Sequence, residues 1–185
     1  MKSFKYLYIP LLSLFIALSS CEKDPQIPNE EELITTVTYT LTPVTGGDPV
    51  IFSFRDLDGD GGQNPVIVEG RLKANTVYNA VIGLYNESVS PVDTITNEVS
   101  EEALEHQFFY TFSDVNISFI YTDHDSENHP IGIMTKVTTG EPSEGMVTII
   151  LRHLPDKFAS GVSDGDITNA GGESDIEVSF LVIAE

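Results

Sequence analysis

The sequence predicts an all-β protein, an antiparallel Greek-key β-sandwich with at most one short helix. Apolar and polar residues alternate with a period of two in one segment after another, which is typical of strands with one buried face. Clusters of Gly, Pro, Asn and Asp separate these segments and mark turns. No long segment has the apolar period of a helix, so the helical crossovers of a parallel α/β sheet are missing.

Four candidate strands occupy the first half of the body. Residues 36–42 place Val37, Tyr39 and Leu41 alternately with threonines, and residues 77–85 alternate in the same way. Residues 50–54 and 65–70 are short apolar runs bounded by turn signals, which indicates two further strands.

The second half contains four more strands and the only candidate helix. The strands are predicted over residues 107–112, 115–121, 146–152 and 176–182. Residues 100–107 begin with Ser100, a possible N-cap, and continue with acidic residues suited to a first helical turn. We expect a helix of two turns at most in this segment.

A local motif favours one kind of sandwich. Leu72, Thr76 and Tyr78 occupy the spacing that introduces a late strand in fibronectin type III and other immunoglobulin-like domains, with Ala74 in place of the family's proline. The resemblance implies a tyrosine corner, in which the tyrosine hydroxyl bonds to the preceding loop. No linker-like run divides residues 34–185, so we expect one enlarged immunoglobulin-like sandwich there.

The N-terminal segment predicts export. Residues 1–20 combine Lys2 and Lys5, an apolar run over residues 6–15 and small residues at the end, which is the organisation of a secretory signal peptide. The apolar run is shorter than the ~20 residues of a membrane-spanning helix.

The only cysteine has an anchoring role in this interpretation. Leu18-Ser19-Ser20-Cys21 resembles the lipobox of bacterial lipoproteins, which implies that the Cys21 thiol is acylated and that Cys21 becomes the N-terminus. Each buried methylene of an acyl chain contributes about 0.8 kcal/mol, so two or three chains hold a protein stably. We therefore expect the membrane to be a partner through the N-terminal acyl chains.

Residues 21–33 predict a lipidated, flexible tether, because two prolines and five acidic residues follow the cysteine. The charged cluster Glu22, Lys23 and Asp24 resembles the signal that sends lipoproteins of the Bacteroidota to the cell surface. Residues 105–110 and 169–178 also resemble small lipoproteins of that phylum. These resemblances imply a lipid-anchored outer-membrane protein that faces the cell exterior, with the periplasmic face as the alternative.

The charge balance excludes one class of partner. The chain has 29 Asp and Glu against 9 Lys and Arg, a formal net charge of −20. Such a surface repels phosphate backbones, so we expect no nucleic-acid partner. Cations and cationic partners remain compatible with the sequence, although strong net charge also serves solubility alone.

Three acidic loops are candidate calcium sites. Asp56, Asp58 and Asp60 lie at alternate positions before Gly61, which resembles the first half of an EF-hand loop. Ile67 stands where that motif needs a glutamate, so the second half is missing. The other two loops contribute Asp123, Asp125 and Glu127, and Asp164, Asp166, Glu173 and Asp175. The competing interpretation is turn chemistry, since Asp and Asn side chains bond the nearby backbone.

The histidines support an alternative metal site. His106, His124, His129 and His153 could bind zinc or copper together with carboxylates, although no pair has the spacing of a known helical motif. Asp93-Thr94-Ile95 resembles the O-glycosylation site of the Bacteroidota, which implies a modified Thr94.

The sequence gives little support for catalysis. Gly161-Val162-Ser163-Asp164-Gly165 has the letters of the Gly-x-Ser-x-Gly motif, but no strand directly before it and no helix directly after it are predicted, so a nucleophile elbow is not indicated. There is no phosphate-binding loop. We therefore expect a non-enzymatic, lipid-anchored binding or accessory module of the cell envelope, stabilised by calcium if by any ion. Its expected partner is a TonB-dependent transporter or another envelope protein. The alternatives are a protein that captures a metal or small ligand for such a transporter, and a surface hydrolase.

Overall fold

The computed structural model describes residues 33–59 and 62–185. The predictions for the signal peptide, for Cys21 and for the tether up to residue 32 lie outside the described residues, as do those for Asp60 and Gly61.

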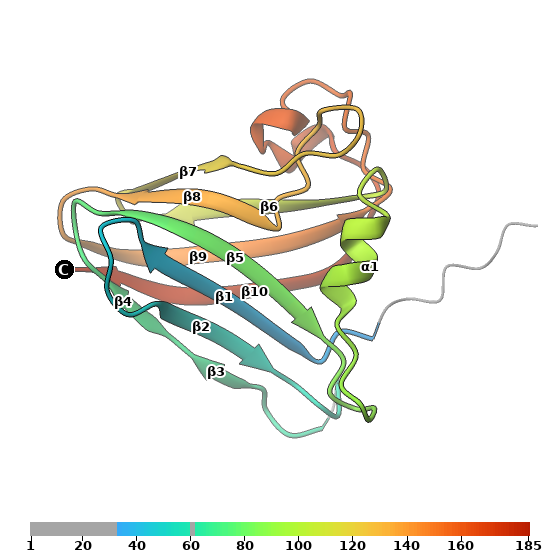
Figure 1. Ribbon diagram of the computed structural model, residues 1–185, viewed down its shortest axis with the longest axis horizontal. Helices are drawn as coiled ribbons and strands as arrows, with labels where there is room; N and C mark the ends of the chain where they lie inside the picture. The colour runs from blue at the N-terminus through green and yellow to red at the C-terminus, as the bar shows by residue number, and fades with distance from the viewer. Residues whose placement is uncertain (1–32, 60–61) are drawn as a thin grey trace, which may run out of the picture. The chain divides into compact units, whose positions relative to one another are not determined.

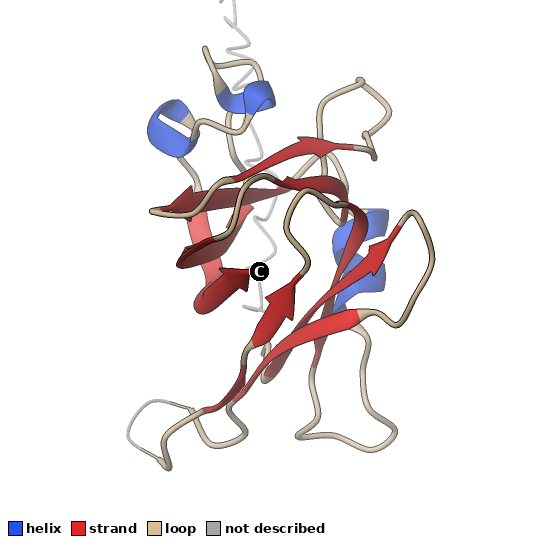
Figure 2. Cartoon of the chain, turned by 90° about the vertical axis from the view of Figure 1, so that its left-hand side faces the viewer, coloured by secondary structure: helices blue, strands red, loops and turns tan. Residues whose placement is uncertain are grey.

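Two sheets pack against each other, and the all-β sandwich is confirmed (Figure 1, Figure 2). One sheet has the order β3-β2-β1-β5-β8-β7, and the other has the order β4-β10-β9-β6. Their bounds are β1 (Thr36–Pro43), β2 (Val50–Arg55), β3 (Val66–Val68), β4 (Gly70–Leu72), β5 (Val77–Tyr85), β6 (His106–Ser113), β7 (Ile117–Tyr121), β8 (Met134–Thr139), β9 (Ser143–His153) and β10 (Glu173–Ala184).

One strand pair departs from the antiparallel prediction. The segment expected as a single strand over residues 65–70 is divided at Glu69 into β3, which pairs with β2, and β4, which belongs to the other sheet. There β4 lies parallel to β10, with Gly70 opposite Val182. The chain passes from β3 to β4 without turning back, so β4 runs in the same direction as β3. This direction is also that of β10, and the two strands therefore pair in parallel.

The alternating residues form the core between the sheets. Val37, Tyr39 and Leu41 of β1 are at most 1% exposed, and their counterparts on β5, β9 and β10 are buried with them. Full burial of a large apolar side chain contributes roughly 1.5–3 kcal/mol. The period of two therefore produces the sandwich directly, since each strand turns one apolar row inward.

The predicted helix lies in the wrong place. The observed helix α1 covers Ile95–Glu101, so Ser100 lies inside its last turn, and residues 106 and 107 belong to β6. Ile95 and Val99 lie one turn apart and are buried against the core. Burial of this apolar pair outweighs the capping preference of Ser100, because packing supplies most of a short helix's stability.

A strand absent from the prediction completes the larger sheet. β8 turns Thr135, Val137 and Thr139 inward, so polar residues occupy two of its three buried positions and hide the alternation. The Thr139 Oγ1 accepts the N–H of Thr76 at 2.9 Å and donates to the Lys73 carbonyl at 2.7 Å. The Thr135 Oγ1 lies 3.3 Å from the Tyr39 hydroxyl, within hydrogen-bond distance, so both threonines can be buried with their hydroxyls satisfied.

The tyrosine-corner hydrogen bond is present. The Tyr78 hydroxyl oxygen accepts the N–H of Lys73 at 2.7 Å, and the ring is 1% exposed. The strand that it introduces is β5, the fifth of the ten in the described residues.

In the part of the chain that the structure describes, we find no helix long and apolar enough to span a membrane.

Candidate functional site

The first acidic loop uses its carboxylates on its own backbone. The Asp56 Oδ1 accepts the N–H groups of Asp58 and Gly59, at 3.3 and 2.9 Å, and the Asp58 Oδ2 accepts the N–H of Gln63 at 3.0 Å. These contacts are those of turn chemistry. Calcium binding by this loop stays a prediction, which calorimetry with and without a chelator checks through the melting temperature.

The second acidic loop, between β7 and β8, is held in the same way. The Asp123 oxygens accept the N–H groups of Gly132 and Met134, at 2.9 and 3.0 Å. The Asp125 Oδ1 accepts those of Glu127 and His129, both at 2.9 Å. Glu127 itself is exposed. The carboxylates of Asp123 and Asp125 therefore fix the course of the loop and leave Glu127 at its surface.

Lys157 joins this loop to two others, a role that the sequence reasoning missed. Its Nζ donates to the Asp125 Oδ2 at 2.9 Å and to the carbonyls of Ala103 and Pro130, at 2.6 and 3.0 Å. An ammonium has three donors, so all of them are used. The side chains of Lys157 and Asp125 are 4% and 0% exposed, respectively.

Burial and charge act in opposite senses on this ion pair. Burial lowers the pKa of Lys157, and the Asp125 carboxylate opposes that change. Burial alone would raise the pKa of Asp125, but the hydrogen bonds from Lys157 and from the backbone outweigh it, and the pKa lies below its usual value. The three hydrogen-bond acceptors around Nζ fit the ammonium form, so the pair is ionic.

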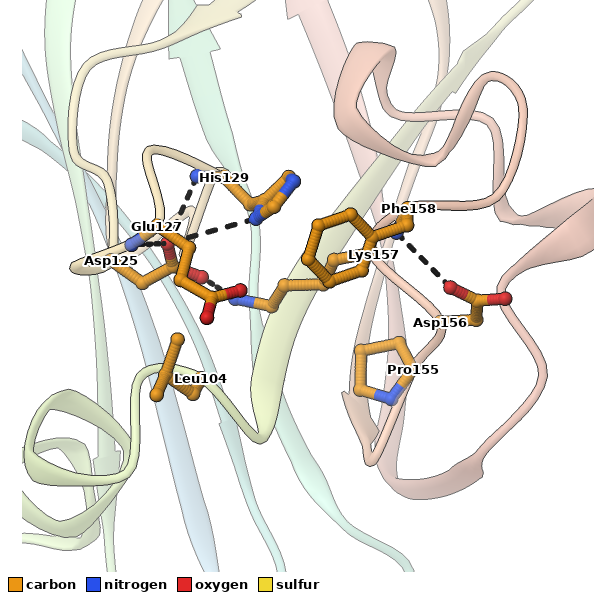
Figure 3. Close-up of a pocket in the computed structure, with 8 residues that line it drawn as sticks. All are labelled: Leu104, Asp125, Glu127, His129, Pro155, Asp156, Lys157 and Phe158. Carbon is orange, nitrogen blue, oxygen red and sulfur yellow. Dashed lines mark hydrogen bonds and ion pairs between the residues drawn. The ribbon is translucent and has the colours of Figure 1, made fainter.

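A pocket of about 240 Å³ lies over the Asp125–Lys157 pair (Figure 3). Glu127 and His129 come from the loop between β7 and β8, and Pro155, Asp156 and Phe158 come from the loop between β9 and β10. Leu104, which follows α1, completes the lining. Three segments that are distant in the sequence thus form one preformed concave surface.

Phe158 is the most exposed large apolar side chain of this pocket, at 76%. Its ring meets the His129 ring edge to face with 4.4 Å between centroids, and its N–H donates to the Asp156 Oδ1 at 3.1 Å. The ring is therefore held in place although most of its surface faces solvent. Figure 3 shows the two rings side by side at the pocket.

A second cavity of about 510 Å³ adjoins the first, since Leu104 and Asp125 line both. Glu101, Glu102 and Glu105 line it together with His124. The two cavities form a continuous acidic surface around Leu104, which is 50% exposed.

The four histidines do not form one cluster. His106 and His153 stack with 4.8 Å between ring centroids, each with a carboxylate nearby: the Asp175 Oδ2 lies 3.8 Å from His106 and the Glu105 Oε2 lies 3.7 Å from His153. His124 and His129 line different cavities. Within residues 33–59 and 62–185 no group of three ligands is arranged to hold a metal ion, and a transition-metal site stays a prediction.

Among the described residues, the third acidic loop forms no group of ligands for a metal ion either. The Asp166 Oδ1 accepts the N–H of Thr168 at 2.9 Å at the start of a 3-10 turn, whereas Asp175 lies beside His106. Thr94 is the residue before α1, partly buried, and its glycosylation stays a prediction.

The pocket had one weak signal in the sequence. Lys157 is one of only nine basic residues in a strongly acidic chain, and it lies between Pro155 and Phe158 in a segment without alternation. Because basic residues are so few in this chain, a lysine in such a segment is a candidate partner for a buried carboxylate. No family model, curated protein or solved structure matches this chain.

Proposed function

We propose that this protein is a non-catalytic, lipid-anchored binding module of the cell envelope, which binds its partner at the pocket around Phe158. The observation that carries the proposal is a preformed pocket with an exposed aromatic ring above a buried ion pair. Exposed aromatic side chains in concave surfaces are typical anchors of binding interfaces.

The ion pair supports binding better than it supports stability. A buried ion pair contributes little more than apolar residues of the same volume would, because both charges lose their hydration. The Lys157 Nζ, however, ties its own loop to two other segments: to the one after α1 through Ala103, and to the loop between β7 and β8 through Asp125 and Pro130. Loops fixed before binding lose less conformational entropy when a ligand arrives, which strengthens binding.

The anchor would place the pocket at the membrane surface. Acylation of Cys21, expected from the lipobox, gives a protein that stays on its membrane, where a TonB-dependent transporter or another envelope protein is the proposed partner. Binding at the loops leaves the strands as a rigid scaffold, an arrangement common among β-sandwich binding proteins.

Site-specific photo-crosslinking in intact cells tests this proposal. A photoreactive phenylalanine analogue in place of Phe158 should give one discrete adduct with an envelope protein, identified by mass spectrometry. The matched control carries the analogue in place of Ile120 of β7, which is also exposed, at 61%, and should give no such adduct. Equal adducts at the two positions, or none at position 158, would contradict the proposal.

A further inference from the structure

The pocket carries negative charge that its own lining leaves unbalanced. Lys157 is the one lysine or arginine among the residues that line it, and Asp125 neutralises that charge at a distance of 2.9 Å. Glu127 and Asp156 then remain as the other carboxylates of the lining, although the Asp156 Oδ1 also accepts the N–H of Phe158. The adjoining cavity adds Glu101, Glu102 and Glu105. An acidic field of this kind raises the local concentration of cations and repels anionic ligands such as phosphates.

Part of the wall of the pocket is apolar. Leu104, Pro155 and Phe158 line it, and the Phe158 ring is 76% exposed. A hydrated metal ion gains nothing from such a wall, whereas a cation on a hydrocarbon stem can pack its methylenes against the ring. A cation above an aromatic face is also attracted by the ring quadrupole.

The volume limits the size of what enters. About 240 Å³ lies below the range of pockets that enclose whole small-molecule ligands, roughly 300–1,000 Å³. One long side chain fits this space, and the adjoining cavity of about 510 Å³ leaves room for the chain on which it is carried. The pocket thus suits one residue of a larger partner.

From this charge complementarity we propose that the pocket receives the side chain of a lysine or arginine in an exposed segment of a partner protein. The stem packs on Phe158 and Leu104, and the charged group lies among the carboxylates of Glu127 and Asp156. This inference rests on the proposed function and adds the chemistry of the partner.

Nuclear magnetic resonance titration of the full-length protein in detergent tests the inference. The probe is the peptide acetyl-Gly-Lys-Gly-Arg-Gly-amide, and its neutral counterpart contains acetyl-lysine and citrulline. We expect the charged peptide to bind at least tenfold more tightly than the neutral one. F158A and E127Q should each weaken its binding several-fold, and added salt should weaken it further because the attraction is electrostatic.

Two matched variants control for general effects. Ile120→Ala removes an exposed apolar side chain on β7, and Glu144→Gln removes an exposed carboxylate on β9, and neither residue lines the pocket. Both should leave the affinity unchanged. If Glu144→Gln weakens binding as much as E127Q does, the peptide binds through net charge alone, and if Ile120→Ala weakens it as much as F158A does, the contact is not specific to the pocket; either result makes the inference wrong.

Two further outcomes would overturn the inference. Equal affinity for the neutral peptide, or no binding of the charged one, excludes a basic side chain as the ligand. Binding of spermidine as tight as that of the charged peptide assigns the pocket to free amines instead of a protein segment. Either result leaves the crosslinking test of the proposed function to stand or fail separately.

Discussion

Lys157 shows how one residue can determine the geometry of a site. Its ammonium joins its own loop to two other chain segments, and the carboxylate of Asp125 is fully buried beside it. Replacement by an apolar residue would leave that carboxylate without its counter-ion. Loss of one partner from a buried pair typically costs about 3–5 kcal/mol, far more than the pair contributes as a whole.

We therefore expect Lys157→Met to lower the free energy of unfolding by about 3–5 kcal/mol. Urea denaturation followed by circular dichroism measures this change. Lys136→Met on β8 is the matched control, since Lys136 is exposed, and should change stability by less than about 0.5 kcal/mol. A loss of similar size in both variants would show that Lys157 acts only through net charge.

His106 should make stability depend on pH. Burial lowers its pKa, against the opposing effects of its hydrogen bond to the Glu102 carbonyl and of the Asp175 carboxylate, and the stacked His153 lowers it further. The unfolded chain, with a pKa of about 6.5, binds the proton more readily. The contribution of His106 is therefore complete above about pH 6.5 and is lost as pH falls from there toward the lower pKa of the folded state.

Comparison of wild type with His106→Gln isolates this contribution. Urea midpoints measured between pH 7.5 and 5.5 should fall with decreasing pH in the wild type, and fall less in the variant. Asp125, whose pKa is also lowered, loses its contribution only at more acidic pH, below about 3.9. Parallel profiles for the two proteins would mean that His106 does not titrate in this range.

At the scale of single elements, β8 depends on hydrogen bonds as much as on packing. Thr139→Val should lower the free energy of unfolding by about 1–3 kcal/mol, because the N–H of Thr76 loses its buried acceptor. Thr138→Val is the matched control on the same strand, with its side chain in solvent. Thermal unfolding of the two variants checks the prediction, which equal melting temperatures would contradict.

The sequence allowed most elements to be predicted, but β8 was missed and α1 was misplaced. Eight strand segments were predicted from alternating apolar residues or from short apolar runs, whereas β8 turns threonines inward. The helix α1 has only two buried apolar residues, Ile95 and Val99, which is too short a pattern to locate a helix, and the capping signal at Ser100 was misleading.

The site could be predicted only in part. The acidic loop with Asp123, Asp125 and Glu127 was identified from its spacing, and it does line the pocket. Its partner Lys157 lies 32 residues from Asp125 and 54 from Ala103, contacts that no local pattern reveals. The pairing of Lys157 with Asp125 depends on how the loops are arranged in three dimensions, which the sequence pattern does not show.

At the scale of the whole molecule, the predicted lipid anchor would determine where the pocket acts. Cys21→Ser removes the thiol that acylation requires, so we expect the protein to move from the membrane fraction to the soluble fraction of the cell envelope. Fractionation followed by immunoblotting measures this, and mass spectrometry of the native protein checks the acyl chains. A Cys21→Ser protein that stays with the membrane would contradict the predicted anchor.

The direction of β10 has a practical consequence for experiments on binding. The strand leaves the pocket loops at Glu173 and runs for 12 residues, roughly 40 Å, to the far end of the sandwich. Glu185 is fastened there by hydrogen bonds between its backbone and those of Leu72 and Ala74. Immobilisation on a biosensor chip through a linker after this residue would attach the protein at the end opposite the pocket. Phe158 would then stay accessible to the analyte.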